Sequence, residues 1–208
     1  FDKPIGDSNC VGCGQCAAVC PTGAIIIKND SHRLWKELNQ EDTIAVAQVA
    51  PAVRVAVAKE FGYNGENVMG KIVAALRRIG FNYIFDTSTA ADLTVMEESK
   101  EFADRLANGG KLPLFTSCCP AWIKYAENEY PEILPNISTC RSPMQMFASV
   151  INEKFKGEGK KILSVAVMPC TAKKGEAARD EFKDENGKPL VDFVITTQEL
   201  IMMIKEAG

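Results

Sequence analysis

Residues 43–50 have the sequence TIAVAQVA, a nearly continuous apolar run followed directly by Pro51. Strands with one face in water alternate apolar and polar residues, whereas an apolar run of this kind is typical of a strand buried on both faces. Sheets covered on both faces are mostly parallel sheets, in which helices pack on each side. We therefore expect this segment to be an inner strand of a parallel sheet.

The chain beyond this run repeats a pattern of apolar strands and amphipathic helices. Apolar residues between Val68 and Ile79 recur at helical spacing, and Ser142–Pro143 forms a cap and first-turn pair for a later helix. The pattern predicts an α/β fold with a mostly parallel sheet covered by helices. The further expected strands are 82–88, 113–117, 162–168 and 191–197, and the further expected helices are 90–108, 121–130, 142–155 and 198–206.

The first part of the chain differs in composition from the rest. Residues 1–27 contain a cysteine-rich loop that gives way to the apolar run AIIIK, which predicts a small, partial cluster-binding module of the ferredoxin type. Residues 28–42, KNDSHRLWKELNQED, are polar and are expected to be a linker, and residues 43–208 form the α/β domain. Because the chain starts without Met and stops within a helical pattern, we expect it to be part of a longer polypeptide.

Composition excludes several classes of function. The 208 residues are 46% hydrophobic and 25% charged, which is ordinary for a globular protein. A net charge of −3 offers no basic surface, so no nucleic-acid partner is expected. No apolar run reaches the ~20 residues that a membrane span needs, and no export leader is visible. With cysteines in reduced, metal-binding patterns, we expect a cytoplasmic protein.

The eight cysteines fall into two groups. Cys10, Cys13, Cys16 and Cys20, followed by Pro21, spell C-x2-C-x2-C-x3-C-P, the run that binds [4Fe–4S] clusters. In double-cluster modules the first three cysteines bind one cluster and the fourth binds its neighbour. The sister motif is absent from this sequence, so we expect the remaining ligands to come from the rest of the polypeptide or another subunit.

Other interpretations of these cysteines are weaker. A disulfide framework belongs to short secreted chains with poor cores, and structural zinc favours two separated ligand pairs. One cluster held by all four cysteines is geometrically less comfortable. The single histidine, His32, lies in a polar run, which argues against imidazole-rich metal sites and Ser–His–Asp catalysis.

Three loops are expected to meet at one edge of the sheet. Cys119 and Cys170 each follow the carboxyl end of an expected strand, where ligands of parallel α/β sheets gather. The junction VAPAVRV at 49–55 opens on the same edge. This placement predicts a second cysteine-built metal site.

Three strings of the sequence resemble the catalytic domain of [FeFe]-hydrogenases: FTSCCPAW at 115–122, VMPCTAKKGEA at 167–177 and ADLTVMEE at 91–98. They stand in the family's order, and the likeness extends over the whole chain, covering the last ferredoxin motif and about the first half of the domain that holds the H-cluster. The resemblance implies the first part of the two-lobed iron hydrogenase domain. It also implies an H-cluster, a [4Fe–4S] cube joined to a two-iron unit with CO, cyanide and a dithiolate.

The resemblance also implies roles for single residues. Cys119 and Cys170 match the first two ligands of the cube, whereas the family's later C-x3-C segment is absent from this sequence. Cys118 matches the cysteine that transfers protons at the dithiolate. Glu98, Glu101 and Ser138 match the family's proton relay, and the two acids lie three apart on one face of an expected helix. From the residues alone, either acid would be an ordinary solvated side chain.

Further positions contact the two-iron unit in the family. Lys173 matches a lysine that donates to one cyanide, and Met168 would pack beside the dithiolate as a soft apolar wall. Ala50 and Pro51 fit a loop whose backbone N–H approaches the other cyanide. Ala52 stands where many relatives have Ser, and Cys140 has no matching role, so we interpret it as a buried apolar thiol.

The resemblance implies an enzyme that interconverts H2 with protons and electrons, with ferredoxin or another redox protein as its partner. A hydrogenase-like iron–sulfur assembly or scaffold protein is the first alternative, although that branch usually lacks the paired Cys118–Cys119. An H2-sensory relative is the second. A plain electron-transfer ferredoxin explains residues 1–27 but leaves the α/β domain without a function.

Overall fold

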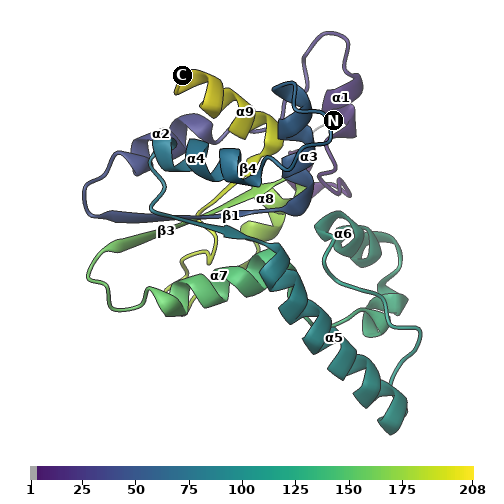
Figure 1. Cartoon of the computed structure of the whole chain (residues 1–208). Helices are drawn as coiled ribbons and strands as arrows, with labels where there is room; N and C mark the ends of the chain where they lie inside the picture. Colours follow the sequence, from purple (N-terminus) through teal and green to yellow (C-terminus); the bar gives the residue numbers. More distant parts are fainter. Residues whose placement is uncertain (1–3) are drawn as a thin grey trace.

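The computed structural model describes residues 4–208, so the first three residues of the expected module lie outside the described residues. Four parallel strands form one sheet in the order β2-β1-β3-β4 (Figure 1). Their bounds are Thr43–Val49 (β1), Tyr83–Asp86 (β2), Lys161–Met168 (β3) and Phe193–Thr196 (β4). The expected α/β class with a parallel sheet is confirmed, and the TIAVAQVA segment is an inner strand.

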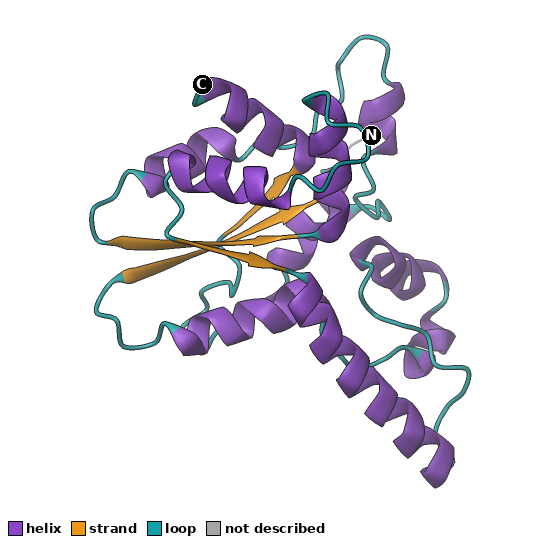
Figure 2. Ribbon diagram, in the orientation of Figure 1, coloured by secondary structure: helices purple, strands orange, loops and turns teal. Residues whose placement is uncertain are grey.

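Helices cover both faces of the sheet (Figure 2). Helices α2, α3, α4 and α9 lie over one face and α7 over the other, while α5 projects away from the sheet (Figure 1). The bounds are Ser31–Leu38 (α2), Pro51–Glu60 (α3), Met69–Ile79 (α4), Ser88–Asn108 (α5), Pro120–Glu129 (α6), Pro143–Lys154 (α7), Ala172–Ala177 (α8) and Thr197–Glu206 (α9).

The pleat of β1 divides the core between the two faces. Ala45, Ala47 and Val49 belong to the larger apolar cluster, which also contains residues of α2, α3, α4 and α9. Val46 points to the opposite face and packs with Phe147 of α7. Successive residues of a strand point to opposite faces, so a nearly continuous apolar run is expected where both faces are covered.

The expected strand at 113–117 is wrong. Only an isolated bridge joins Phe115 to Ile137, and neither residue belongs to the sheet. Phe115 N–H donates to the Asn136 carbonyl, and Ser138 N–H donates to the Phe115 carbonyl. Pro113 and Pro135 flank this bridge and have no N–H with which to extend a ladder. The Cys118–Cys119 loop therefore does not follow a strand of the sheet.

The expected linker at 28–42 contains a packed helix. Leu34 of α2 is 0% exposed within the main core, and Trp35 and Leu38 pack against it. The segment is polar on average, but its few apolar residues lie on one face of the helix and pack against the core. Before it, residues 4–30 contain only a short 3-10 helix, Ile5–Asp7, and α1, Gln15–Val19. Within residues 4–208, no helix is both long and apolar enough to cross a membrane.

Because α2 belongs to the core, Leu34→Ala should lower the free energy of unfolding by about 3 kcal/mol, the usual cost of a cavity at a buried leucine. Ile26→Ala truncates a side chain that is 80% exposed and should change it by less than ~0.5 kcal/mol. Urea unfolding of both variants measures the difference. If the two variants had equal free energies of unfolding, α2 would not contribute to the core and the interpretation as a linker would hold.

Candidate iron–sulfur and catalytic site

Two of the three expected loops leave neighbouring strands at the same edge. Ala50 caps α3 directly after β1, and Met168 ends β3 shortly before Cys170. Ala50 N–H donates to the Val167 carbonyl at 3.0 Å, and Pro51 has no N–H. The expected backbone donor therefore cannot be Ala50 or Pro51. The next N–H, that of Ala52, lies in the first turn of α3, where N–H groups lack a partner within the helix.

The third loop reaches this edge from α6. Cys119 is the N-cap of α6, with Pro120 as the first helical residue. Lys173 Nζ, on α8, donates to the Cys118 carbonyl at 2.9 Å and lies 2.6 Å from Glu176 Oε2. An ammonium has three N–H donors, so Lys173 can hold this loop and still donate to an anionic ligand. The lysine thus connects the Cys118–Cys119 loop to the helix that follows Cys170.

Two members of the expected relay are in direct contact. Ser138 Oγ donates to Glu101 Oε2 at 2.8 Å, and Ser138 is buried. Arg105, one helical turn after Glu101, donates to Glu101 Oε1 from Nη2 at 2.6 Å. Burial alone would raise the pKa of Glu101, but hydrogen bonds from Ser138, Arg105 and the Thr139 N–H outweigh it and lower that pKa. The Glu101 carboxylate is therefore held ionised.

The other two residues of the expected relay, Glu98 and Cys118, are not joined to it by side-chain hydrogen bonds among the described residues. Glu98 Oε1 is buried without a hydrogen-bond partner among the described residues, and Cys118 is exposed. A buried carboxylate oxygen without a partner costs free energy unless a further group supplies a hydrogen bond. Glu98 thus occupies a position at which an additional donor is needed.

Cys140 does not fit the interpretation as an apolar buried thiol. Its thiol lies 3.8 Å from Glu101 Oε2, and its N–H donates to Ser138 Oγ at 3.1 Å. Burial, aided by the nearby Glu101 and Glu98 charges, raises the pKa of Cys140. Sequence patterns gave no signal for this location. Cys140 is a half-buried, protonated thiol beside the outer relay.

The cysteines of the N-terminal motif lie on an open loop. Cys10, Cys13 and Cys16 are exposed and all eight cysteines are free. A hydrogen bond with the Thr22 hydroxyl, joined by backbone N–H groups, lowers the pKa of Cys20 to about 6 and so favours the thiolate that iron requires. Within residues 4–208, no three His, Cys, Asp or Glu side chains converge on a single metal-ion position.

Lys174 was missed by sequence reasoning. Its Nζ lies 2.9 Å from Asp30 Oδ2, 3.0 Å from Glu199 Oε1 and 2.7 Å from the Val194 carbonyl. Burial would raise the pKa of Asp30, but the Lys174 ammonium outweighs it and lowers that pKa. Arg105 was missed as well, although its spacing of four from Glu101 on an expected helix was a usable signal. Lys174 gave no such signal, because its partners are distant in sequence.

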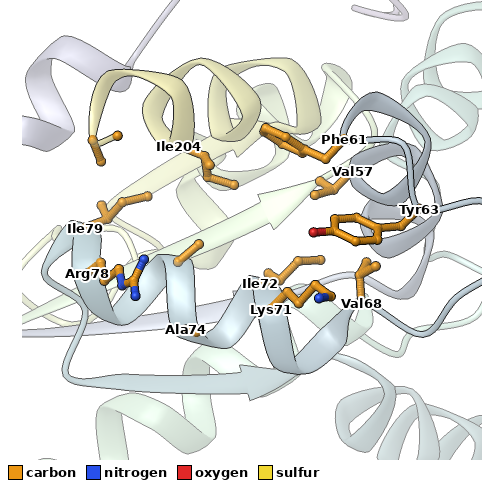
Figure 3. Close-up of a pocket in the computed structure, with 13 residues that line it drawn as sticks. Val57, Phe61, Tyr63, Val68, Lys71, Ile72, Ala74, Arg78, Ile79 and Ile204 are labelled. Atoms are coloured by element: carbon orange, nitrogen blue, oxygen red, sulfur yellow. The ribbon is translucent and has the colours of Figure 1, made fainter.

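One recess lies away from all these residues. A cavity of about 440 Å³ opens between α3, α4 and α9 and is lined mainly by apolar side chains such as Val57, Ile72 and Ile204 (Figure 3). None of the expected site residues lines it. A second cavity of about 420 Å³ is lined by Ser138, Cys140 and Glu176 and adjoins the relay.

Comparison with known proteins identifies the family. The family model described as iron only hydrogenase large subunit, C-terminal domain, matches residues 43–208, and the model for a 4Fe-4S binding domain matches residues 4–26. The chain therefore belongs to the iron-only hydrogenase family. [4Fe–4S] and H-cluster cofactors follow from these two matches.

The relatives that match this chain include both hydrogenases and iron–sulfur assembly proteins. The NADP-reducing hydrogenase subunit HndD of Solidesulfovibrio fructosivorans is 45% identical over 99% of this chain and 37% of its own length. Cytosolic iron-sulfur assembly component 3 of Bos taurus is 34% identical over 98% of this chain and 46% of its own length. The apo [FeFe]-hydrogenase HydA1 of Chlamydomonas reinhardtii, as a variant, superposes with a TM-score of 0.78 at 36% identity, covering 86% of this chain and 48% of that one. The chain thus spans less than half the length of each.

The residues at the sheet edge suit the family's cofactor. Cys119 and Cys170 are free thiols, and the Lys173 ammonium lies at the same edge. The unpartnered Glu98 oxygen marks a place where a further hydrogen-bond donor is required. Thiolates with a nearby cation are the chemistry that an anionic iron–sulfur centre needs.

Because its pKa is lowered in the folded protein, Glu101 stabilises the fold above its unfolded pKa of ~4.3 and loses this contribution as the pH falls through the folded value. Glu101→Gln should therefore flatten the fall in unfolding free energy below pH ~4.3. Urea unfolding at pH 3 to 7 measures this slope. Asp104→Asn, an exposed acid on the same helix, is the matched control and should retain the slope; the same slope in Glu101→Gln would contradict the assignment.

Proposed function

We propose that the chain is part of an [FeFe]-hydrogenase that interconverts H2 with protons and electrons. The observation that carries the proposal is the meeting of the Cys118–Cys119 loop with the Cys170 segment through Lys173. When bound, the H-cluster supplies the iron at which H2 is formed or split. Cys119 and Cys170 would hold the cube, and the remaining ligands would come from a part of the polypeptide beyond this chain.

The chain's own residues would hold and move the proton. Cys118 is exposed at the loop and would exchange the proton with the reacting centre. Glu98 would pass it to Ser138, whose hydroxyl already contacts Glu101. Arg105 favours the ionised form of the Glu101 carboxylate, so Glu101 would release a proton soon after accepting it. This property suits the outer end of a relay, where the proton passes to water.

Lys173 and Met168 would complete the pocket. The ammonium is anchored by Glu176 and the Cys118 carbonyl and would donate to a cyanide. Met168 is buried at the end of β3 and would present an apolar wall. Cys10, Cys13, Cys16 and Cys20 would hold the iron–sulfur clusters that accept electrons from ferredoxin or another redox partner. Free thiols persist in a reducing compartment, and we propose the cytoplasm under anaerobic conditions as the setting.

An iron–sulfur assembly role is the second candidate, because proteins of that name match nearly the whole chain. The two functions differ in what the mature protein carries. A hydrogenase carries CO and cyanide, whose infrared stretches lie where proteins do not absorb. Infrared spectra of the matured full-length protein without these bands would favour the assembly role.

Cys118→Ser in the matured full-length enzyme should abolish most H2 evolution from reduced methyl viologen, because serine is a far weaker acid than cysteine. The infrared bands should remain, since Cys118 binds no iron in this account. Thr116→Ala, an exposed hydroxyl on the same loop with no assigned role, is the control and should retain most of the activity. Undiminished H2 evolution in Cys118→Ser would remove the relay assignment.

A further inference from the structure

One hydrogen bond joins the N-terminal loop to the segment after β3. Thr171 Oγ1 donates to the Gly12 carbonyl at 2.7 Å, although the two residues are 159 positions apart. Thr171 directly follows Cys170, and Gly12 directly precedes Cys13. A single side chain therefore connects the immediate neighbours of two expected cluster ligands.

The loop backbone packs closely on this threonine. Gly14 has φ +79°, and a Cβ there would lie 2.9 Å from Thr171 Oγ1 and 3.3 Å from Ile27 Cδ1. Only glycine combines this left-handed conformation with the space available. Gly12 approaches Ala172, the first residue of α8, at ordinary van der Waals distance. The hydrogen bond thus belongs to a packed contact.

A second contact fixes the same two parts of the chain. Lys174, three residues after Thr171, binds Asp30 through its half-buried ammonium, and Asp30 itself is buried. The residues around α8 are therefore attached to the N-terminal loop near residues 12–14 and to Asp30, the N-cap of α2, which lies beyond that loop. Thr171 is thus the residue that contacts the cluster-binding loop itself, while Lys174 holds α8 against the start of α2.

We propose that Thr171 is a positioning residue that fixes the separation between the N-terminal iron–sulfur site and the metal site at Cys170. The proposal rests on the proposed function, in which electrons cross between these two sites. Electron transfer falls steeply as the separation of two centres grows, so a movable loop would make it slow and variable. The hydroxyl of Thr171 is the group that prevents this movement.

The test uses the matured full-length protein and Thr171→Val, which keeps the side-chain shape but removes the donor. Amide hydrogen exchange in the loop 10–16 should become about fivefold faster, the equivalent of ~1 kcal/mol for one hydrogen bond. In electron paramagnetic resonance, the magnetic coupling between the reduced N-terminal cluster and the H-cluster should weaken. Thr171→Ser restores the hydroxyl and should restore both measurements.

A pair of glycine variants separates the contact from backbone strain. Gly14→Ala places a methyl group against Thr171 and should weaken the coupling although the hydroxyl is present. Gly23→Ala has a similar φ of +66° but nothing within 4 Å of its Cβ, so it should leave the coupling unchanged. Similar effects of both variants would assign the change to strain and overturn the positioning role.

Unchanged exchange and unchanged coupling in Thr171→Val would also overturn the proposal. A failure of the proposed function gives a different result, namely no CO or cyanide bands in the wild-type protein. Hydrogen exchange in the loop 10–16 still decides the role of Thr171 in that case, because it needs no H-cluster.

Discussion

The half-buried ammonium of Lys174 holds together the elements that position the site. It forms ion pairs with Asp30 before α2 and Glu199 in α9 and also donates to a carbonyl of β4. Buried ion pairs recover little net stability because both charges lose their hydration, but they strongly disfavour arrangements that leave one charge unpaired. The network therefore fixes where α8 lies relative to the sheet, α9 and the N-terminal segment.

The neighbours of Lys174 then have defined directions. Consecutive residues of a helix point about 100° apart, so Lys173 turns to Glu176 and the Cys118 loop while Lys174 turns to Asp30 and Glu199. Thr171, just before the helix, reaches the N-terminal loop. One short helix thus gathers the three parts of the chain that carry the expected iron ligands. Arg105 has a comparable role at a distance, because it fixes Glu101 against Ser138.

The sequence predicted the sheet well because its strands are buried on both faces and helices of clear period follow them. Residues 113–117 and 28–42 were misjudged for opposite reasons. The apolar side chain of Phe115 in PLFTS packs on Trp122 and not within a sheet. The 28–42 segment is polar on average, yet its Leu34 is buried in the core. The family resemblance assigned Glu101 and Ser138 to one relay, and the two side chains are in contact. The contacts of Thr171, Lys174 and Cys140 link residues far apart in sequence, and no local pattern encodes such pairs.

In the proposed function, the loops at Cys119 and Cys170 meet around one iron–sulfur cube. Iron analysis and Mössbauer spectra of full-length Cys119→Ser and Cys170→Ser test it most directly, with Cys140→Ser as the matched control. Each of the two variants should lose the same cube, while the N-terminal cluster signal and the control remain intact. Retention of all iron in both variants, or loss of different clusters, would contradict it.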